Sequence, residues 1–311
     1  MASARTVAAL VLNWRRADLT VRCLHDLLAV ADAPMCVLVI DNGSGDADVA
    51  TLRDAVDAAN ARGGVHRVEF AALPENRGFT GGMNHGVQWA QAQALPYLLV
   101  LNNDLRLPPD FLRPLVDVLA NDASVAAVGP TVLHPDGTVW AQGGRRAFVP
   151  NGLVLGDHGR APAPRERGPQ ATDFLPCACV LFRTDAVVAV GGFDDAYFMY
   201  WEDVDLCERL RARAGKIVWL PWVRVEHAAG QSSGGGKSPT RKFLMACNAV
   251  RFLKARGTVA NWLGWFVCDV LLWPLTLLSG PRASWAKLCG TWAGLCGHRA
   301  SAADVARWMG G

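Results

Sequence analysis

The sequence predicts an α/β fold in which helices cover both faces of a mostly parallel sheet, giving three layers. Two observations predict it. Over the first 135 residues, apolar runs of strand length alternate with stretches of helical character. Those runs are apolar at nearly every position, which is typical of strands buried on both faces. With 311 residues, of which 51% are hydrophobic and 19% charged, the chain is long and apolar enough to bury a sizeable core.

The predicted elements follow in regular order up to residue 135 and less regularly after it. Apolar runs predict strands at 7–14, 36–43, 66–73, 97–104 and 125–133. Helices are expected between them, at 18–30, 48–62, 81–94 and 109–121. Further on we expect a hairpin within 145–159, strands at 174–182 and 216–227, a loop at 191–198 and a helix at 202–215. The segments 159–170 and 228–239 have the composition of loops.

Polar side chains stand where four of the predicted strands end. They are Asn13, the Asp-Asn-Gly-Ser cluster at 41–44, the Glu-Asn-Arg-Gly cluster at 75–78 and the Asn-Asn-Asp cluster at 102–104. Ligands of open α/β sheets bind outside the carboxyl ends of the strands. We therefore expect these four clusters to form one composite polar site.

Two residues are candidates for holding a metal ion. Asp104 ends a strongly apolar strand, where a lone carboxylate is costly unless it is solvated, paired or metal-bound. Such a carboxylate suits a divalent cation that bridges phosphates, although it equally suits a cap on the turn at 107–109. His227 ends a later strand and precedes a Gly/Ser-rich loop, and a lone His is either a ligand or a structural residue.

Three carboxylates, Glu202, Asp203 and Asp205, begin the helix predicted at 202–215. Acidic residues at a helix N-terminus favour the helix dipole, so capping explains part of this pattern. The preceding segment is rich in aromatic residues and glycine, and an apolar wall raises the pKa of a carboxylate towards that of a general base. The residues alone leave both interpretations open.

A glycine-rich loop at 75–86 opens the helix predicted at 81–94. It matches neither the dinucleotide fingerprint nor the P-loop. Its glycines let the backbone approach a diphosphate at a helix N-terminus, or they simply make a tight connection.

Taken together and in this order, six motifs resemble a known family. They are VLNW at 11–14, DNGSGD at 41–46, ENRGFTGGMNHG at 75–86, LNND at 101–104, GGFDDAYFMYWEDVDLCERL at 191–210, and HAAGQS from residue 227. Over residues 5–256 the chain resembles the inverting glycosyltransferases of family 2, and among them the rhamnosyltransferase-like enzymes of bacterial surface polysaccharide synthesis. The resemblance implies a GT-A-type sandwich, Mg²⁺ or Mn²⁺ as cofactor, and transfer of a sugar (rhamnose or another deoxyhexose) from a dTDP- or UDP-sugar to a saccharide or lipid-linked saccharide.

The resemblance also implies roles for single residues. Asp203 would be the base that deprotonates the acceptor hydroxyl, with Trp201 and Glu202 lining the acceptor site. Asp104 and His227 would hold the metal ion or its diphosphate. The nucleotide-sugar would contact Asn13, Asp41, Asn76, Gly78, Asn84 and Asn103. One departure is Asn102, which occupies the first acidic position of the family's DxD motif, so we expect weaker metal binding.

Charge is unevenly distributed along the chain. Residues 1–227 carry 21 Lys and Arg against 26 Asp and Glu, whereas 228–311 carry 10 against 2 and hold six of the 12 Trp. The stretch 239–256 is a basic amphipathic helix, and 261–280 is nearly all apolar but broken by Asp269 and Pro274. This segment is borderline for a membrane span, and its Trp and flanking basic residues favour interfacial docking. Packing on the body or in a homodimer is the alternative.

Composition also indicates compartment and domain organisation. The N-terminal apolar run is too short for a signal peptide, and nine Cys, an odd number, indicate a reducing compartment. We expect a cytoplasmic protein, peripheral on the inner face of the cell membrane. Its catalytic domain would be 1–238, with a nucleotide-sugar half at 1–133 and an acceptor half at 134–238, and its helical tail 239–311. The net charge of +3 indicates no nucleic-acid partner. The rival function is a catalytically silent nucleotide-sugar-binding scaffold of a glycan assembly complex.

Overall fold

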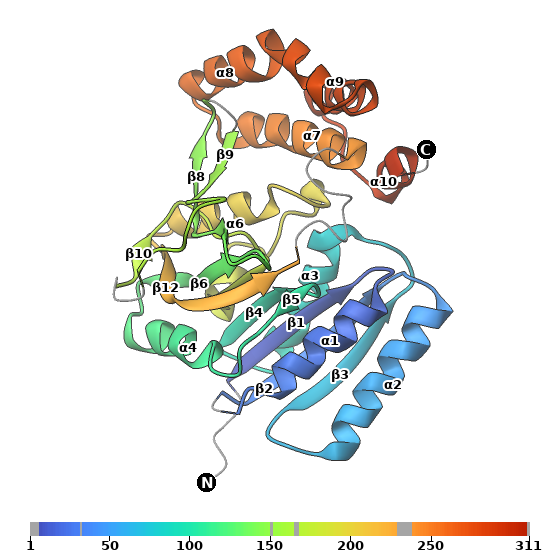
Figure 1. The fold of residues 1–311 in the computed structure, drawn as a ribbon, viewed down its shortest axis with the longest axis vertical. Coiled ribbons are helices and arrows are strands. Elements are labelled where there is room, and N and C mark those ends of the chain that lie inside the picture. The colour runs from blue at the N-terminus through green and yellow to red at the C-terminus, as the bar shows by residue number, and fades with distance from the viewer. Residues whose placement is uncertain (1–5, 32, 150–151, 165–167, 229–237, 310–311) are drawn as a thin grey trace.

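The structure is a computed structural model, and it describes residues 6–31, 33–149, 152–164, 168–228 and 238–309. At its centre lies a mixed sheet with the strand order β10-β12-β6-β11-β4-β1-β2-β3, to which β5 adds at β12 and β7 at β6 (Figure 1). The strands are β1 (Val7–Asn13), β2 (Met35–Asn42), β3 (Arg67–Leu73), β4 (Tyr97–Asn102), β5 (Leu105–Arg106), β6 (Val125–Leu133), β7 (Val139–Ala141), β10 (Gln170–Ala171), β11 (Cys179–Arg183) and β12 (Lys216–His227). A separate hairpin, which starts one residue before the expected range, pairs β8 (Gly144–Ala147) with β9 (Gly152–Leu155).

Helices cover both faces of the sheet. In the body of the protein they are α1 (Ala17–Leu28), α2 (Asp46–Arg62), α3 (Gly78–Ala92), α4 (Leu112–Asn121), α5 (Thr184–Ala189), η1 (Asp195–Tyr197) and α6 (Glu202–Arg211). Side chains alternate across a strand, so Val7 and Val11 of β1 share a core with α1, α2 and α4, whereas Ala8 and Leu10 share another with α3 and α6. This arrangement confirms the three-layer α/β architecture.

The sheet is parallel over its first four strands and antiparallel at β11. β2 pairs in parallel with β1 and β3, and β1 with β4, as the apolar runs predict. β11 runs antiparallel to both of its neighbours, β4 and β6. It begins only at Cys179, five residues later than expected, because Pro176 lacks the N–H that a strand ladder requires. The apolar character of 174–178 reflects burial in a loop and not a strand.

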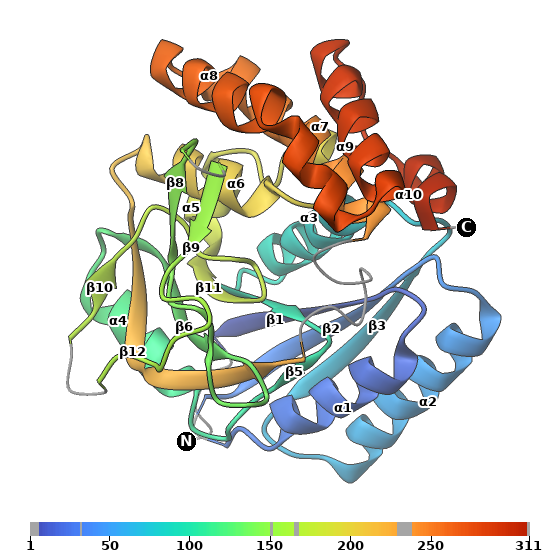
Figure 2. The same ribbon diagram turned by 45° about the horizontal axis from the view of Figure 1, so that its top comes forward.

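Residues 239–309 form a helical layer at one end of the body (Figure 2). It comprises α7 (Pro239–Arg256), α8 (Val259–Trp265), η2 (Phe266–Leu271), η3 (Trp273–Ser279), α9 (Pro281–Leu295) and α10 (Ala302–Met309). α7 is shared between tail and body. Its Val250 and Phe252 lie in the same core as the sheet, whereas its Phe243 and Leu244 pack against the last helices.

The apolar segment after α7 is bent rather than straight. Within the described residues, no single helix is long and apolar enough to cross a membrane. The stretches Val259–Leu271 and Trp273–Ser279 reach that length and hydropathy only as a pair, and a bend of 54° separates them. Pro274 follows this break, as expected of a residue that removes a helix hydrogen bond.

Candidate functional site

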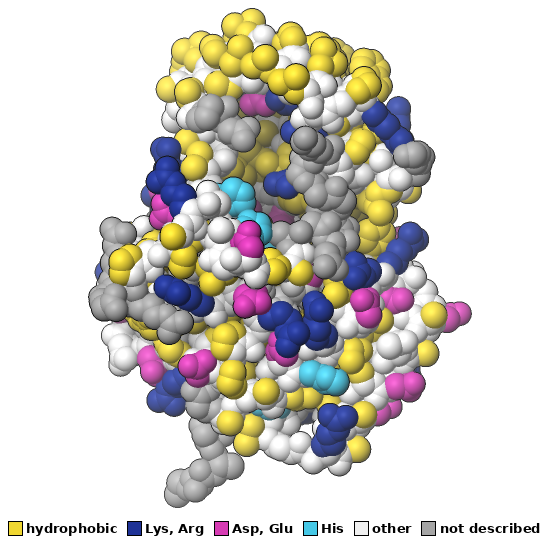
Figure 3. Space-filling model, in the orientation of Figure 1, with side chains coloured by type: hydrophobic (Ala, Val, Ile, Leu, Met, Phe, Trp, Pro, Cys, Tyr) yellow, Lys and Arg dark blue, Asp and Glu magenta, His cyan; other side chains and the backbone are white. Residues whose placement is uncertain are grey.

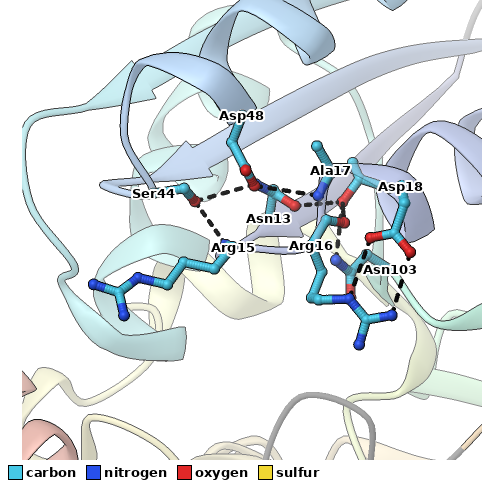
Figure 4. A network of polar contacts seen from close by, with 9 residues as sticks. Asn13, Arg15, Arg16, Ala17, Asp18, Ser44, Asp48 and Asn103 are labelled. Carbon is cyan, nitrogen blue, oxygen red and sulfur yellow. Dashed lines mark hydrogen bonds and ion pairs between the residues drawn. The ribbon is translucent and has the colours of Figure 1, made fainter.

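The carboxyl ends of β1 and β2 carry a buried polar network (Figure 4). Asn13 has no exposed surface, and its Nδ2 donates to Asp41 Oδ1 at 2.8 Å, to Asp48 Oδ2 at 2.9 Å and to Ser44 Oγ at 3.1 Å. The second carboxylate oxygen of Asp41 accepts from the backbone N–H of Ser44 at 3.0 Å. These bonds satisfy both buried groups and fix their orientation.

The same network reaches the end of β4 through one hydroxyl. Thr20 Oγ1 donates to Asn13 Oδ1 at 2.8 Å and accepts from Asn103 Nδ2 at 2.9 Å. Three polar clusters that lie far apart in the sequence are therefore hydrogen-bonded to one another.

Asn42, the last residue of β2, organises the glycine-rich loop. Its Nδ2 donates to Asn76 Oδ1 and to the Gly78 carbonyl, both at 3.0 Å, and its Oδ1 accepts from the Arg77 N–H at 3.0 Å. Gly78 has φ +73°, and a Cβ at this position would lie 2.5 Å from the carbonyl oxygen of Phe198. Only glycine fits this conformation and contact without strain. The helix therefore starts at Gly78, three residues earlier than expected.

Asp104 and His227 meet because β5 pairs with the end of β12, which sets His227 opposite Leu105. His227 Nε2 lies 2.9 Å from Asp104 Oδ1, and both side chains are buried. Asn102 Nδ2 lies 3.5 Å from the same ring nitrogen. The edge of the Trp140 ring packs against the imidazole, with a centroid distance of 4.6 Å.

The donor set of this pair fits a divalent ion that is shared with a phosphate ligand. Among the described residues, no group of three or more His, Cys, Asp or Glu side chains surrounds a common point. Mg²⁺-type sites often take only one or two carboxylates and complete their coordination with water and phosphate oxygens. The buried Nδ1 of His227 has no hydrogen-bond partner within the described part of the chain, so this nitrogen can still donate or accept a hydrogen bond.

The acidic cluster begins α6, where Glu202 is buried and the neighbouring Asp203 is partly buried. Burial raises the pKa of Asp203 to about 6, and hydrogen bonds from the backbone N–H groups of Val204 and Cys177 offset part of that effect. Burial, and then the charge of Asp203, raise the pKa of Glu202 well above its ordinary range. Of this pair, Asp203 therefore releases its proton first, and its charge opposes ionisation of Glu202. Asp205 differs from both, because Arg209 and Arg256 bind it at 2.7 and 2.8 Å.

The segment before these acids has an unusual backbone. Phe198, Tyr200 and Trp201 have φ values of 55°, 73° and 74°, a region that bulky residues rarely occupy. The fully buried Asn248 of α7 holds this strained segment. Its Nδ2 lies 2.7–3.0 Å from the carbonyl oxygens of Tyr197, Met199 and Tyr200. Strain of this kind persists only where the surroundings enforce it.

Backbone contacts join the acids to the edge that carries Asp104. The Cys177 N–H donates to Asp203, and the adjacent Ala178 carbonyl accepts from the Asn102 N–H at 2.9 Å. Asp104 follows Asn102 by two residues. The acidic pair and the Asp104–His227 pair thus lie on either side of one short segment, at the carboxyl edge of the sheet where ligands of α/β folds bind.

Two residues expected in the site make other contacts. Trp201 is only 2% exposed, and its ring packs between Phe148 and Phe252 in the core. The amide of Asn84 binds both backbone groups of Phe193 at 2.8 Å, together with Asp195 Oδ1 at 2.7 Å. Their described contacts stabilise the walls of the site, namely the segment before the acidic pair.

Sequence reasoning missed several residues that hold the site together. They are Thr20, Asp48 and Asn248, and the role of Asn42 in holding the glycine-rich loop was also missed. Asn42 lies in the polar cluster that ends β2, so its position was a usable signal. Asn248 had a weaker signal, a single amide in an otherwise apolar stretch of helix, where burial requires hydrogen-bond partners.

Comparison with known proteins gives a family match and a set of relatives. The model of "Glycosyl transferase family 2" matches residues 9–190. The N-acetylglucosaminyl-diphospho-decaprenol L-rhamnosyltransferase of Mycobacterium tuberculosis is 29% identical over 235 residues, which are 68% of this chain and 73% of the relative. The family model covers nearly all of β1, β2 and β4, the strands whose ends carry the Asn13 network and lead to Asp104.

Two solved structures share the fold at low sequence identity. GalNAc-T7, crystallised with UDP, GalNAc and Mn²⁺, is 14% identical with a TM-score of 0.64, covering 98% of this chain and 58% of that one. The mannosyltransferase PcManGT of Pyrobaculum calidifontis, in complex with GDP-Man and Mn²⁺, is 18% identical with a TM-score of 0.56, covering 98% of this chain and 79% of that one. These likenesses confirm the GT-A-type architecture expected from the sequence.

Proposed function

The chain belongs to glycosyl transferase family 2, and from that membership we propose a metal-dependent inverting transfer of a sugar from a dTDP- or UDP-sugar to a saccharide or lipid-linked saccharide. One observation carries the proposal. Asp203, an acid with a pKa of about 6, is joined through one backbone segment to the strand end that carries Asp104. In this proposal the proton acceptor, Asp203, and the metal site at Asp104 lie on opposite sides of the sugar that is transferred.

The relatives support the finer part of the proposal. The Mycobacterium tuberculosis relative is named an L-rhamnosyltransferase acting on N-acetylglucosaminyl-diphospho-decaprenol. This name favours rhamnose, or another deoxyhexose, as the transferred sugar and a lipid-linked saccharide as acceptor. Such an acceptor would place the protein at the cytoplasmic face of the membrane, where nucleotide-sugars are available.

We assign donor binding to the polar network and the pair at the end of β12. The network that Asn13, Asp41 and Asn103 hold together would shape the nucleoside site, and the loop that Asn76 and Gly78 shape would approach the diphosphate. Asp104 and His227 would hold Mg²⁺ or Mn²⁺, which supplies positive charge to the departing diphosphate. With Asn102 in place of a second carboxylate, the protein contributes less negative charge to that ion.

Asp203 acts as the base in this proposal. Its carboxylate accepts the proton of the acceptor hydroxyl, whose oxygen bonds to the anomeric carbon as the bond from that carbon to the diphosphate oxygen breaks. A single displacement of this kind inverts the anomeric centre and needs one base rather than two flanking carboxylates. Burial and the charge of Asp203 raise the pKa of Glu202 well above its ordinary range, and in its protonated form Glu202 would donate a hydrogen bond to the acceptor.

A transfer assay with the full chain tests the proposal. Release of dTDP or UDP and formation of the lipid product would be followed with dTDP-rhamnose and UDP-sugars, with N-acetylglucosaminyl-diphospho-polyprenol as acceptor, in Mn²⁺, Mg²⁺ or EDTA. We expect metal-dependent transfer, with loss of transfer but not of nucleotide binding in Asp203→Asn. Nucleotide binding without transfer from any donor would instead favour the scaffold function.

A further inference from the structure

The apolar side chains that the tail exposes are concentrated on one face. Among the described residues, every exposed large hydrophobic side chain lies between Val259 and Met309, apart from Val65 and Val149. Val149 borders the same face, since its Cγ2 lies 3.0 Å from where a Cβ on Gly264 would be. Figure 3 shows hydrophobic side chains gathered over the top of the molecule, where Figure 1 places α8 and α9. A patch of this extent is unusual for a protein surface that faces only water.

The polarity of this layer is reversed relative to a water-soluble helical layer. Ser284 is 1% exposed and bonds Thr276 Oγ1 at 2.6 Å, while Leu275 and Leu278 on the same segment are 61% and 85% exposed. Asp269 and Lys287 pair at 2.6 Å with their side chains mostly buried. Polar groups are therefore satisfied inside the layer and leucines point outward. This is the arrangement of a surface that faces lipid, where polar groups turn away from the hydrocarbon.

The charges and tryptophans of the layer match an anionic bilayer. Between residues 238 and 309 the chain has nine Lys and Arg and two acidic residues. Both acids have partners inside the layer: Asp269 pairs with Lys287, and Asp304 accepts a hydrogen bond from Ser301 Oγ and lies 2.9 Å from His298 Nε2. Trp285 and Trp292, seven residues apart on α9, are 59% and 69% exposed. Basic residues attract anionic headgroups, and tryptophan is enriched at the membrane interface.

We propose that the face formed by α8, η2, η3 and α9 inserts in the plane of an anionic lipid bilayer, as a monotopic anchor and not as a span. The bend of 54° fits this orientation, because each half is too short to cross alone. α7 links the anchor to the site, since Asn248 holds the strained segment and Arg256 binds Asp205 of α6. Resting on the proposed function, we infer further that the anchored layer presents Asp203 to a lipid-linked acceptor.

Vesicle flotation tests the anchor. The full chain would be mixed with vesicles of phosphatidylcholine, alone or with about 30% phosphatidylglycerol. We expect flotation with the anionic vesicles, and a loss of partitioning of about tenfold for each of Leu275→Glu and Leu278→Glu, because each leucine then no longer enters the bilayer. Val65→Glu is the matched control, an exposed apolar residue exchanged for acid on the opposite part of the molecule, and it should float like the wild type.

Three results would overturn the proposal. The first is wild-type protein that stays at the bottom of the gradient with anionic vesicles. The second is flotation of the leucine variants equal to that of Val65→Glu. The third is a wild-type dimer that the leucine variants convert to monomer while flotation stays unchanged, which would assign the face to a second copy of the chain. Nucleoside diphosphate release with a water-soluble acceptor reports the proposed function separately, because it needs no bilayer.

Discussion

Replacing Asp203 by Asn should abolish transfer and at the same time stabilise the protein at neutral pH. Asn keeps the shape of the side chain and an oxygen that can accept the 2.8 Å hydrogen bond from the Val204 N–H. It removes the charge, which burial makes costly, and replaces the other carboxylate oxygen by an NH2 group. The pKa of this carboxyl is about 6 in the folded protein against an ordinary value of 3.8. The folded state thus binds the proton more tightly than the unfolded chain does.

The magnitude follows from linkage. A carboxyl whose pKa is raised on folding contributes stability below pH 4 that is lost as the pH rises through about 6. At about 1.4 kcal/mol per pH unit, the wild type loses up to about 3 kcal/mol across this window, and Asp203→Asn does not. For a protein of this size, that difference raises the Tm at pH 7.5 by about 3–8 °C. Loss of a general base should lower kcat by about 10²- to 10⁴-fold.

Thermal unfolding at pH 4 to 8 and a transfer assay on the same preparations measure both effects. Asp185→Asn is the control, because its Oδ1 accepts from the Ala186 N–H at 2.7 Å in the same local geometry but at an exposed position. If the Tm of wild type and of Asp203→Asn changed with pH in the same way, the claim that this charge destabilises the fold would be refuted. Near-normal turnover of the variant would refute the role of Asp203 as base.

Three further predictions concern other parts of the site. Gly78→Ala should lower the free energy of unfolding by about 1–3 kcal/mol and weaken nucleotide binding. The reason is that alanine is strained at a φ of +73° and that its Cβ would press on the Phe198 carbonyl. Thermal shift with and without nucleotide measures both effects. Asn102→Asp should strengthen Mn²⁺ affinity by adding a carboxylate near the Asp104–His227 pair, seen as a lower Mn²⁺ requirement in nucleotide release; unchanged affinity would count against that pair as the metal site. Asn248→Asp should lower kcat while leaving the KM for the donor unchanged. The variant sets a carboxylate against three carbonyl oxygens of the segment that precedes Glu202 and Asp203, and it does not touch the Asn13 network. An equal rise in KM would mean that the whole fold is disturbed.

The sheet was predictable because its signal is local. The runs at 7–14 and 36–43 are apolar at every core position. Short runs of this kind indicate strands that are buried on both faces of a sheet. The clustering of Asn13, Asp41 and Asn103 was also predictable, since parallel strands end at a common edge. The pairing of Asp104 with His227 was only implied by resemblance, because it depends on a two-residue strand, β5, that has no periodic pattern to detect.

Features that depend on distant contacts were not predictable. Nothing in Phe198, Tyr200 or Trp201 indicates a positive φ, because that conformation is imposed by Asn248, about fifty residues later. The antiparallel direction of β11 likewise depends on its insertion between β4 and β6 and not on its own residues. For the tail, hydropathy indicated apolar helices, but only the structure shows that their polar groups are turned inward.

The sharing of α7 between body and tail has a consequence for how the protein is made. Val250 and Phe252 complete the core on the face of the sheet opposite α1 and α2. While the ribosome is still adding residues before 250, α3 and α6 can cover part of that face, but the part of the core that α7 supplies is missing. This core is therefore completed only once α7 has been made, and a shortened protein keeps it only if it is cut after Arg256.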